Sequence, residues 1–364
     1  MSRATAKPEA VEGLAPPVFQ SGRAELYHAD CLEWLATREA NSIHAVVTDP
    51  PYGLVEYSAK EQAKLRKGHG GVWRIPPSFD GHTRAPLPRF TTLTKRDVDA
   101  LSSFFERWAR ALFPALVPGA YVMVASNPLL SHVVATALTA AGLERRGELV
   151  RLVMTMRGGD RPKNAHEEFP DVTVMPRSMW EPWLLFRKAL DGRVQDNLRK
   201  WKTGGLRRIS GAKPFGDVIQ SHPTRKSERA LAPHPSLKPQ DFLRQIVRAV
   251  LPLGDGVLLD PFAGSGSTLA AAEAVGYQSI GIELDKHFVE VAKRGIPALV
   301  ALPIGAGKPN SRAASNERGT HGTVGDQRRR PEESRDCPRD CEDDPAACRG
   351  EVRGSVQGWT EEGA

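Results

Sequence analysis

Apolar residues along the chain follow two alternating patterns, short continuous runs and longer stretches in which every third or fourth residue is apolar. The first pattern is typical of buried strands and the second of amphipathic helices. Helical spacing is clearest at residues 97–113, and Pro114 followed by Pro118 and Gly119 predicts where that helix ends. Strands are expected at 24–27, 43–48, 120–125, 149–156, 183–187, 256–259 and 279–282. Helices are expected at 31–35, 97–113, 129–141, 239–250, 267–275 and 286–293.

Strands that alternate with helices in this way predict an α/β fold, with a mostly parallel sheet and helices on both of its faces. The alternation occupies residues 18–303 and is interrupted at 54–96 and 187–230, where no regular pattern is evident. Residues 304–364 are rich in glycine, proline, serine and charges, so they cannot bury enough apolar surface to offset their ordering entropy. We therefore expect one folded domain between a short disordered N-terminus at 1–17 and a disordered tail at 304–364.

The composition is that of a folded, intracellular protein. Of the 364 residues, 40% are hydrophobic and 26% are charged, which excludes a chain that is disordered throughout. No run approaches the roughly 20 apolar residues of a membrane span, and the N-terminus lacks the apolar core of a signal peptide, so a cytoplasmic location without membrane contact is expected. Cys31 stands alone, and Cys337, Cys341 and Cys348 have neither the spacing of a disulfide framework nor that of zinc ligands. No metal site is therefore expected.

Charge is distributed unevenly along the chain. Lys and Arg number 50 against 43 Asp and Glu, a net +7, but the first 303 residues hold 40 basic and 31 acidic residues. The excess lies in the two irregular segments, with nine basic against three acidic residues at 54–96 and twelve against four at 187–230. Such segments suit a phosphate-rich partner, although solvated surface loops have the same composition. Charge alone leaves both interpretations open.

A glycine-rich turn follows the strand expected at 256–259. The sequence DPFAGSGST at 260–268 ends this strand and opens a helix, and Gly264 and Gly266 allow a tight turn with close backbone approach to a ligand. Glu283 ends the next strand, where a carboxylate can accept hydrogen bonds from both hydroxyls of a ribose. The turn lacks the lysine of a P-loop and the third glycine of a dinucleotide motif. A nucleoside cofactor without a pyrophosphate is therefore expected, the alternative being a glycine turn without a ligand.

A second site follows the strand at 43–48 and consists of Asp49, Pro50, Pro51 and Tyr52. The prolines stiffen the turn and leave the Pro50 carbonyl outside the strand ladder. Asp49 and that carbonyl can together accept both hydrogens of an exocyclic amino group, and Tyr52 offers a flat face for stacking a base. An enzyme that acts on a base taken out of a helix needs this combination, although a proline turn after a strand can also be purely structural.

The two sites, joined by the segment HPSLKP at 234–239, resemble the amino-group DNA methyltransferases, which transfer a methyl group from S-adenosylmethionine to N6 of adenine or N4 of cytosine. The proline site precedes the glycine site, an order similar to that of the β subgroup, which is circularly permuted. The resemblance covers roughly residues 24–296. It implies a Rossmann-like S-adenosylmethionine-dependent methyltransferase fold in which segments 54–96 and 187–230 recognise the target.

The resemblance also assigns roles to individual residues. Residues 49–52 would be catalytic, holding the amine for direct methyl transfer without a covalent intermediate. The cofactor-binding residues that it implies are Asp30, Lys238, Asp260, Phe262, Gly264, Gly266, Thr268 and Glu283. Asp30 has an alternative role as a helix cap, and Lys238 and His234 lie in a proline-rich loop where such residues are usually structural. Cys31 has no evident histidine partner and is expected to be buried rather than nucleophilic.

Asp49 favours adenine as the target base, because the cytosine enzymes more often carry serine at this position. N4 of cytosine stays an alternative, as does a catalytically silent DNA-binding regulator. Methyltransferases that act on RNA or on a protein amide are a further alternative, but they usually carry asparagine here. Double-stranded DNA is the expected partner, with Arg207 and Arg208 among its phosphate contacts. By analogy with similar enzymes we also expect a homodimer, a partner restriction or defence protein, and association with the nucleoid.

Overall fold

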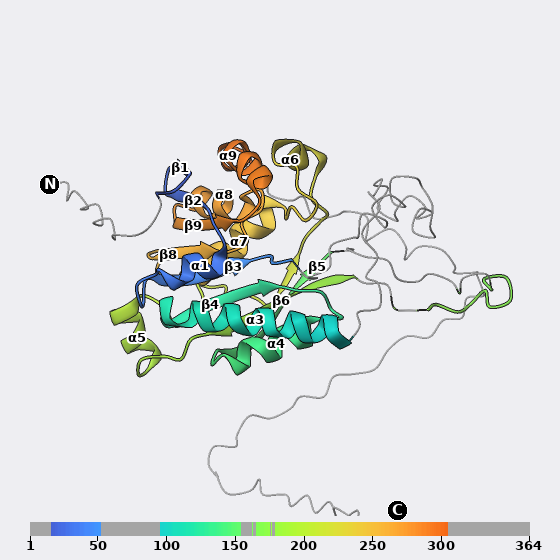
Figure 1. Cartoon of the computed structure of the whole chain (residues 1–364), viewed down its shortest axis with the longest axis horizontal. Coiled ribbons are helices and arrows are strands. Elements are labelled where there is room, and N and C mark those ends of the chain that lie inside the picture. Colours follow the sequence, from blue (N-terminus) through green and yellow to red (C-terminus); the bar gives the residue numbers. More distant parts are fainter. Residues whose placement is uncertain are drawn as a thin grey trace, which may run out of the picture. The chain divides into compact units, whose positions relative to one another are not determined.

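The computed structural model describes residues 16–51, 95–153 and 162–304, except 163–164, 175 and 177–178. Within these residues, nine strands form one sheet in the order β1-β2-β9-β8-β3-β4-β6-β5-β7 (Figure 1). The strands are β1 Phe19–Ser21, β2 Ala24–His28, β3 Ile43–Thr48, β4 Leu116–Ala125, β5 Glu144–Leu152, β6 Trp180–Arg187, β7 Val218–Gln220, β8 Val257–Asp260 and β9 Gln278–Glu283. The helices are α1 Cys31–Ala36, α3 Lys95–Ala115, α4 Ser131–Ala140, α5 Val194–Trp201, α6 Lys226–Leu231, α7 Gln240–Val250, α8 Ser267–Ala274 and α9 Lys286–Val300.

Several predictions lie outside the described residues. These are Tyr52, nearly all of the segment 54–96, the predicted disorder of residues 1–15 and 305–364, and the three cysteines of the C-terminal segment.

The sheet is mostly parallel. Its neighbouring strands β2, β9, β8, β3 and β4 all run in the same direction. β6 is antiparallel to β4 and to β5, β1 is antiparallel to β2, and β7 joins β5 in parallel. The predicted α/β fold with a mostly parallel sheet is therefore confirmed. The parallel strands all end at one edge of the sheet, named here the carboxyl edge, and begin at the other, named the amino edge.

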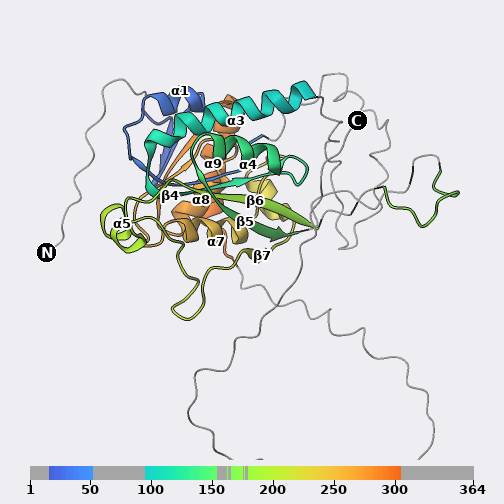
Figure 2. The same cartoon turned by 90° about the horizontal axis from the view of Figure 1, so that it is seen from below.

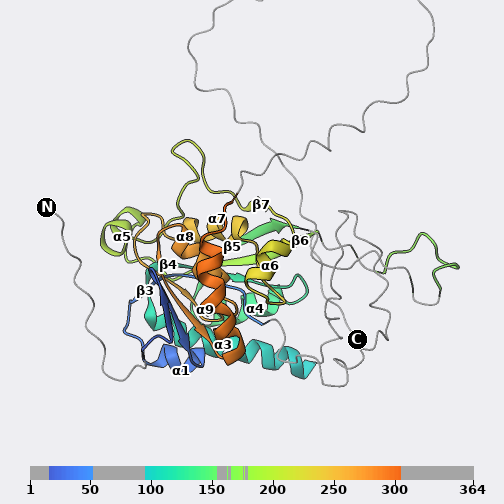
Figure 3. The same ribbon diagram turned by 90° about the horizontal axis from the view of Figure 1, so that it is seen from above.

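Helices cover both faces of the sheet. Helices α1, α3 and α4 pack on one face, and α7, α8 and α9 lie on the other (Figures 2 and 3). Along β3, Val46 belongs to the first apolar cluster while Ala45 and Val47 belong to the second. A strand buried on both faces has an unbroken apolar run, which is why the IHAVVT pattern predicts β3 correctly. None of the helices in the described ranges combines the length and apolar character that crossing a membrane requires.

The junction between α3 and β4 differs from the prediction. Helix α3 includes Pro114 instead of ending there, and β4 already begins at Leu116, before Pro118 and Gly119. A proline in the last turn removes a single helical hydrogen bond, and the Pro114 carbonyl accepts a bond from the backbone N–H of Asn41. Pro118 and Gly119 lie where the register between β3 and β4 shifts. Pro118 has no backbone N–H, but no ladder hydrogen bond is required at this irregularity.

The segment 187–230 is not the irregular insertion that its composition suggests. It contains α5, the edge strand β7 and α6, which are short elements that apolar periodicity does not detect. Its first part lies at the amino edge, because Nη1 of Arg207 donates a hydrogen bond of 2.8 Å to the hydroxyl of Tyr277, directly before β9. Its last part, from Ser221, follows β7 and lies at the carboxyl edge. The two ends of the segment are therefore at opposite edges of the sheet.

Candidate active site

Three neighbouring strands bring the predicted motifs together at the carboxyl edge. β3 ends at Thr48, directly before Asp49, while β8 ends at Asp260 and β9 at Glu283. β8 pairs with both β3 and β9, so the three strand ends are adjacent. Ligand sites of open α/β sheets lie at this edge, in the crevice beyond the strands.

A cavity that opens to solvent lies between the two motifs. The segment 234–239 forms another of its walls. Six of the predicted site residues line the cavity: Asp49, Lys238, Asp260, Phe262, Gly264 and Thr268. The structure therefore joins the proline motif, the glycine motif and the segment between them in one site.

Asp260 ties the glycine turn to β3. Its Oδ1 accepts a hydrogen bond of 2.7 Å from the hydroxyl of Thr48 and one of 3.2 Å from the backbone N–H of Phe262. Burial raises the pKa of Asp260 to about 6, against the opposing hydrogen bonds from Thr48 and Thr268. The carboxyl group is mostly ionised at neutral pH and anchors the turn from beneath the cavity.

The two glycines of the turn have no room for a side chain. Gly264 and Gly266 have φ values of +53° and +79°, in the left-handed region that favours glycine. A Cβ atom at Gly266 would lie 2.4 Å from Cγ1 of Ile296, and one at Gly264 would lie 3.0 Å from Nε2 of His234. Both positions are therefore packed against the protein's own side chains, and close approach of the turn to a ligand stays a prediction.

Glu283 holds the turn from the next strand. Its Oε2 accepts a bond of 2.7 Å from the Gly264 N–H, and its Oε1 accepts one of 2.8 Å from the Asp285 N–H. Burial raises the pKa of Glu283, and these backbone bonds oppose the increase. Asp30 lies near it at the end of β2, where His28 pairs with Glu283. The Asp30 carboxylate caps α1, so the role as a helix cap is confirmed, and contact with a cofactor stays a prediction.

Two other predicted positions pack against helices. The ring of Phe262 contacts those of Phe104 and Trp108 on α3, with centroid distances of 6.0 and 5.7 Å. His234 packs edge-on against Phe288 of α9, and burial lowers its pKa. Cys31 is buried, and burial raises the pKa of its thiol to about 12, as expected for a packing residue rather than a nucleophile.

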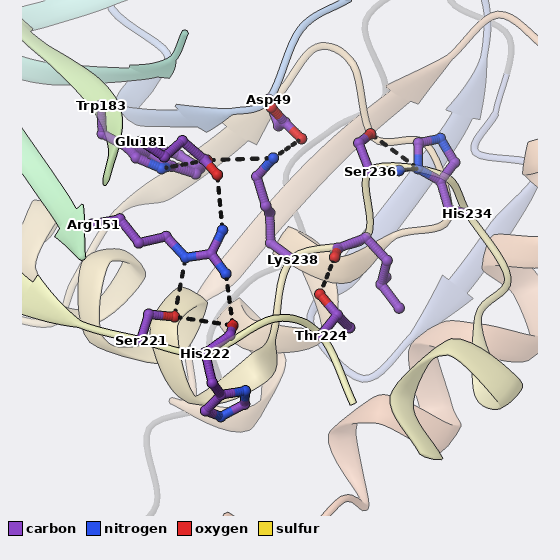
Figure 4. Close-up of polar contacts among 11 residues, drawn as sticks. Asp49, Arg151, Glu181, Trp183, Ser221, His222, Thr224, His234, Ser236 and Lys238 are labelled. Atoms are coloured by element: carbon purple, nitrogen blue, oxygen red, sulfur yellow. Dashed lines mark hydrogen bonds and ion pairs between the residues drawn. The ribbon is translucent and has the colours of Figure 1, made fainter. Parts of the chain in front are cut away.

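Lys238 faces the proline motif. Its ammonium group lies 2.8 Å from Oδ2 of Asp49 and 3.3 Å from Oε1 of Glu181 (Figure 4). Burial lowers the pKa of Lys238, but the carboxylates of Asp49 and Glu181 outweigh burial and hold that pKa above its ordinary value. Pro50 is buried and Pro51 exposed directly after β3. Lys238 thus binds the residue predicted to receive the target amine.

The sequence analysis missed two charged residues of this site. Arg151 on β5 donates from Nη1 to Oε2 of Glu181 on β6 over 2.9 Å, and Nε1 of Trp183 donates to the other carboxylate oxygen over 3.0 Å. Arg151 also donates to Oγ of Ser221 and to the carbonyl of His222, both over 3.0 Å. The sequence contained a sign of this pair, because Arg151 and Glu181 each interrupt an apolar run. A buried charge requires a partner of opposite charge.

Comparison with known proteins identifies the family. The profile of the N6/N4 DNA methylase family matches residues 43–294. The Type II methyltransferase M2.DpnII of Streptococcus pneumoniae is 23% identical over 291 residues, which cover 78% of this chain and 94% of that protein. M.HindIII of Haemophilus influenzae, also a Type II methyltransferase, is 24% identical over 313 residues, covering 78% and 96%.

A solved structure supports the fold. The cytosine-N4-specific PvuII DNA methyltransferase is similar with a TM-score of 0.51 and 14% identity, covering 79% of this chain and 89% of its own. This likeness concerns the fold alone. The family match spans the proline motif, the glycine turn and the strands that bring them together. The chain therefore belongs to the N6/N4 DNA methylase family.

Proposed function

We propose that this member of the family methylates N6 of an adenine that is taken out of double-stranded DNA. DNA methylation with S-adenosylmethionine as the methyl donor is the activity of the chain. The observation that supports the finer assignment is the carboxylate of Asp49, held by Lys238 at the end of β3 and lining the same cavity as the glycine turn. A carboxylate can accept a hydrogen bond from an amino group, and adenine-specific enzymes resemble this chain in carrying aspartate there.

The described residues fit the methyl donor. Gly264 lines the cavity without a side chain, and Glu283 places a carboxylate next to that turn. We assign Glu283 to the ribose hydroxyls, and Asp260, Phe262 and the turn to the rest of the nucleoside. When bound, the donor would supply a methyl carbon activated by positively charged sulfur, for transfer to the amine nitrogen.

The task of the proline motif is to orient the amine. An exocyclic amine is a poor nucleophile because its lone pair is delocalised into the ring. Hydrogen bonds from its two hydrogens to Asp49 and to the Pro50 carbonyl would favour a pyramidal nitrogen and aim the lone pair at the methyl group. Orientation of this kind lowers barriers by several kcal/mol. Tyr52, which lies outside the described residues, is assigned to stacking on the base.

DNA would approach the carboxyl edge. The last part of the segment 187–230 is attached to the site, because the Thr224 hydroxyl donates a hydrogen bond to the Leu237 carbonyl. Arg225 and Arg229 follow it and are exposed. We therefore assign phosphate contacts to this part of the segment and not to Arg207 and Arg208. A homodimer, a partner restriction or defence protein and association with the nucleoid stay predictions from the resemblance.

The test of the catalytic assignment is Asp49→Ala. This variant should lose methyl transfer, because the amine loses one of its two acceptors, and should still bind S-adenosylmethionine in calorimetry. The matched control is Asp255→Ala, an exposed aspartate two residues before β8 at the amino edge, which should keep wild-type turnover. Turnover by Asp49→Ala within about tenfold of wild type, equivalent to about 1.4 kcal/mol of barrier, would contradict the assignment.

The identity of the base has its own test. DNA methylated by the enzyme is digested to nucleosides, and the modified nucleoside is identified by mass spectrometry. N6-methyladenosine in its deoxy form is expected. N4-methyldeoxycytidine would overturn the assignment to adenine while leaving the family and the cofactor intact.

A further inference from the structure

Four charges, of which the last three are buried, form a chain that begins at the proposed acceptor. Asp49, Lys238, Glu181 and Arg151 follow one another with alternating sign, and the joining distances are 2.8, 3.3 and 2.9 Å (Figure 4). The exposed fractions of the side chains are 15%, 11%, 11% and 4%. The charges sum to zero, so each ion has a counterion in a place where water is largely excluded.

Three side chains hold Glu181 in this chain of charges. One of its oxygens accepts a bond from Arg151, and the other lies within reach of both Trp183 and Lys238. Arg151 is itself fixed by Ser221 and by the His222 carbonyl. A carboxylate held from so many directions defines the position of the ammonium group that it attracts.

We propose that Glu181, held by Arg151, is a positioning residue for methyl transfer: it anchors the Lys238 ammonium group so that Lys238 fixes the Asp49 carboxylate for the target amine. Neither residue is among those that line the cavity of the described site, so both act through Lys238. The inference rests on the proposed role of Asp49 as acceptor. It extends the catalytic machinery from β3 to β5 and β6.

Electrostatics give the anchor a second effect, on the charge of Lys238. Burial favours the neutral amine and the two carboxylates favour the cation. The charged or titratable groups around Lys238 are Asp49 after β3, Arg151 on β5, Glu181 on β6, Asp260 at the end of β8, and His234 on its own loop. Without the charge of Glu181, Asp49 is the only one of these two carboxylates that still counteracts the effect of burial. The pKa of Lys238 therefore falls, and the ammonium group loses its proton at a lower pH.

The test is Glu181→Gln, which keeps the shape of the side chain and removes its charge. The matched control is Glu144→Gln, because Glu144 pairs with Arg187 between the same two strands at the amino edge. For Glu181→Gln we expect kcat to fall by about tenfold or more, KM for S-adenosylmethionine to stay within about twofold, and the alkaline limb of the pH–kcat profile to move to lower pH. Glu144→Gln should leave all three unchanged.

Glu181→Gln leaves Arg151 without its counterion, which can prevent folding. The double variant Arg151→Gln/Glu181→Gln removes both charges together and leaves no unpaired buried ion. It should fold and show the same low kcat and unchanged KM for S-adenosylmethionine. Wild-type kcat with a wild-type alkaline limb in a folded variant would overturn the inference. If the Glu181 variants keep wild-type kcat while Asp49→Ala is inactive, the positioning role of Glu181 is rejected and the proposed function stands. An active Asp49→Ala would contradict the proposed function itself.

Discussion

One arginine–glutamate pair lies at each end of the ladder between β5 and β6. Arg151 is opposite Glu181 at the carboxyl edge, and Arg187 is opposite Glu144 at the amino edge. The chemistry is the same, but the side chains of the first pair are 4% and 11% exposed, and those of the second are 9% and 40% exposed. The first pair continues into Lys238 and Asp49, while Glu144 faces solvent.

The two pairs show that location in the fold decides what an ion pair does. A half-exposed pair gains little from its Coulomb attraction, because water and salt screen the charges. A buried pair contributes little net stability as a pair, but the loss of one partner is costly because the other charge stays unpaired. The pair at the carboxyl edge is therefore available for positioning, and the pair at the amino edge only joins two strands.

The largest expected effect is on the free energy of unfolding. Arg151→Ala should lower it by about 3–5 kcal/mol, because Glu181 loses its main counterion in a buried place. Arg187→Ala should lower it by about 1 kcal/mol, because water can solvate the Glu144 carboxylate. Urea denaturation of both variants measures the difference. Equal losses would show that burial does not distinguish the two pairs.

The same contrast between edges applies to two glycines with nearly the same backbone conformation. Gly266, in the glycine turn at the carboxyl edge, has φ +79°, and Gly254, at the amino edge, has φ +77°. A Cβ at Gly266 would meet Ile296 in the core, whereas the nearest atom to one at Gly254 would be Nη1 of Arg207, at the end of a flexible side chain.

Both alanine variants should lose about 1 kcal/mol of unfolding free energy to the left-handed backbone. Gly266→Ala should lose about 1–3 kcal/mol more from overpacking and should bind S-adenosylmethionine more weakly. Denaturation and cofactor titration of the two variants give the comparison. Indistinguishable variants would mean that Ile296 moves aside without cost and that the turn does not need its close packing.

The smallest expected effect concerns DNA binding. Replacement of Arg225 and Arg229 by alanine should reduce the slope of log binding constant against log salt concentration by about 2, since each phosphate contact contributes about 0.9. The paired variant of Arg207 and Arg208 should keep the wild-type slope, because Arg207 lies at the opposite edge of the sheet. The reverse result would place DNA at the amino edge.

Much of the fold follows from local patterns. The strand at 43–48 is predicted to its last residue, because a doubly buried apolar run ends at two prolines. Asp30 is predicted as a cap, and its carboxylate accepts bonds from the N–H groups of Leu32 and Glu33. The three-residue β7 was missed because it is too short to show a period, and α6 was missed because, unlike the equally short α1, it has no side-chain cap to mark its start.

The basic segment 187–230 shows the limit of charge counting. Composition correctly identifies an excess of positive charge, but a count of charged residues does not show towards which edge of the sheet each side chain points. Lys188 turns its ammonium group towards the Leu116 carbonyl at 2.7 Å, and Arg207 binds Tyr277 at the amino edge. The end of β7 and the residues after it reach the carboxyl edge. A chain segment can be basic as a whole and still place part of its charge away from a ligand.

By itself, the sequence determined the family, the two motifs and the strands that carry them, because turn chemistry and apolar periodicity act between residues close together in the chain. Only the tertiary structure decided that Lys238 faces Asp49, and that Glu181 and Arg151 extend the site. These four charges come from separate elements and meet only after the strands have assembled. Their interaction depends on the distances between the charges and on the exclusion of water, and neither can be predicted from residues that are close together in the chain.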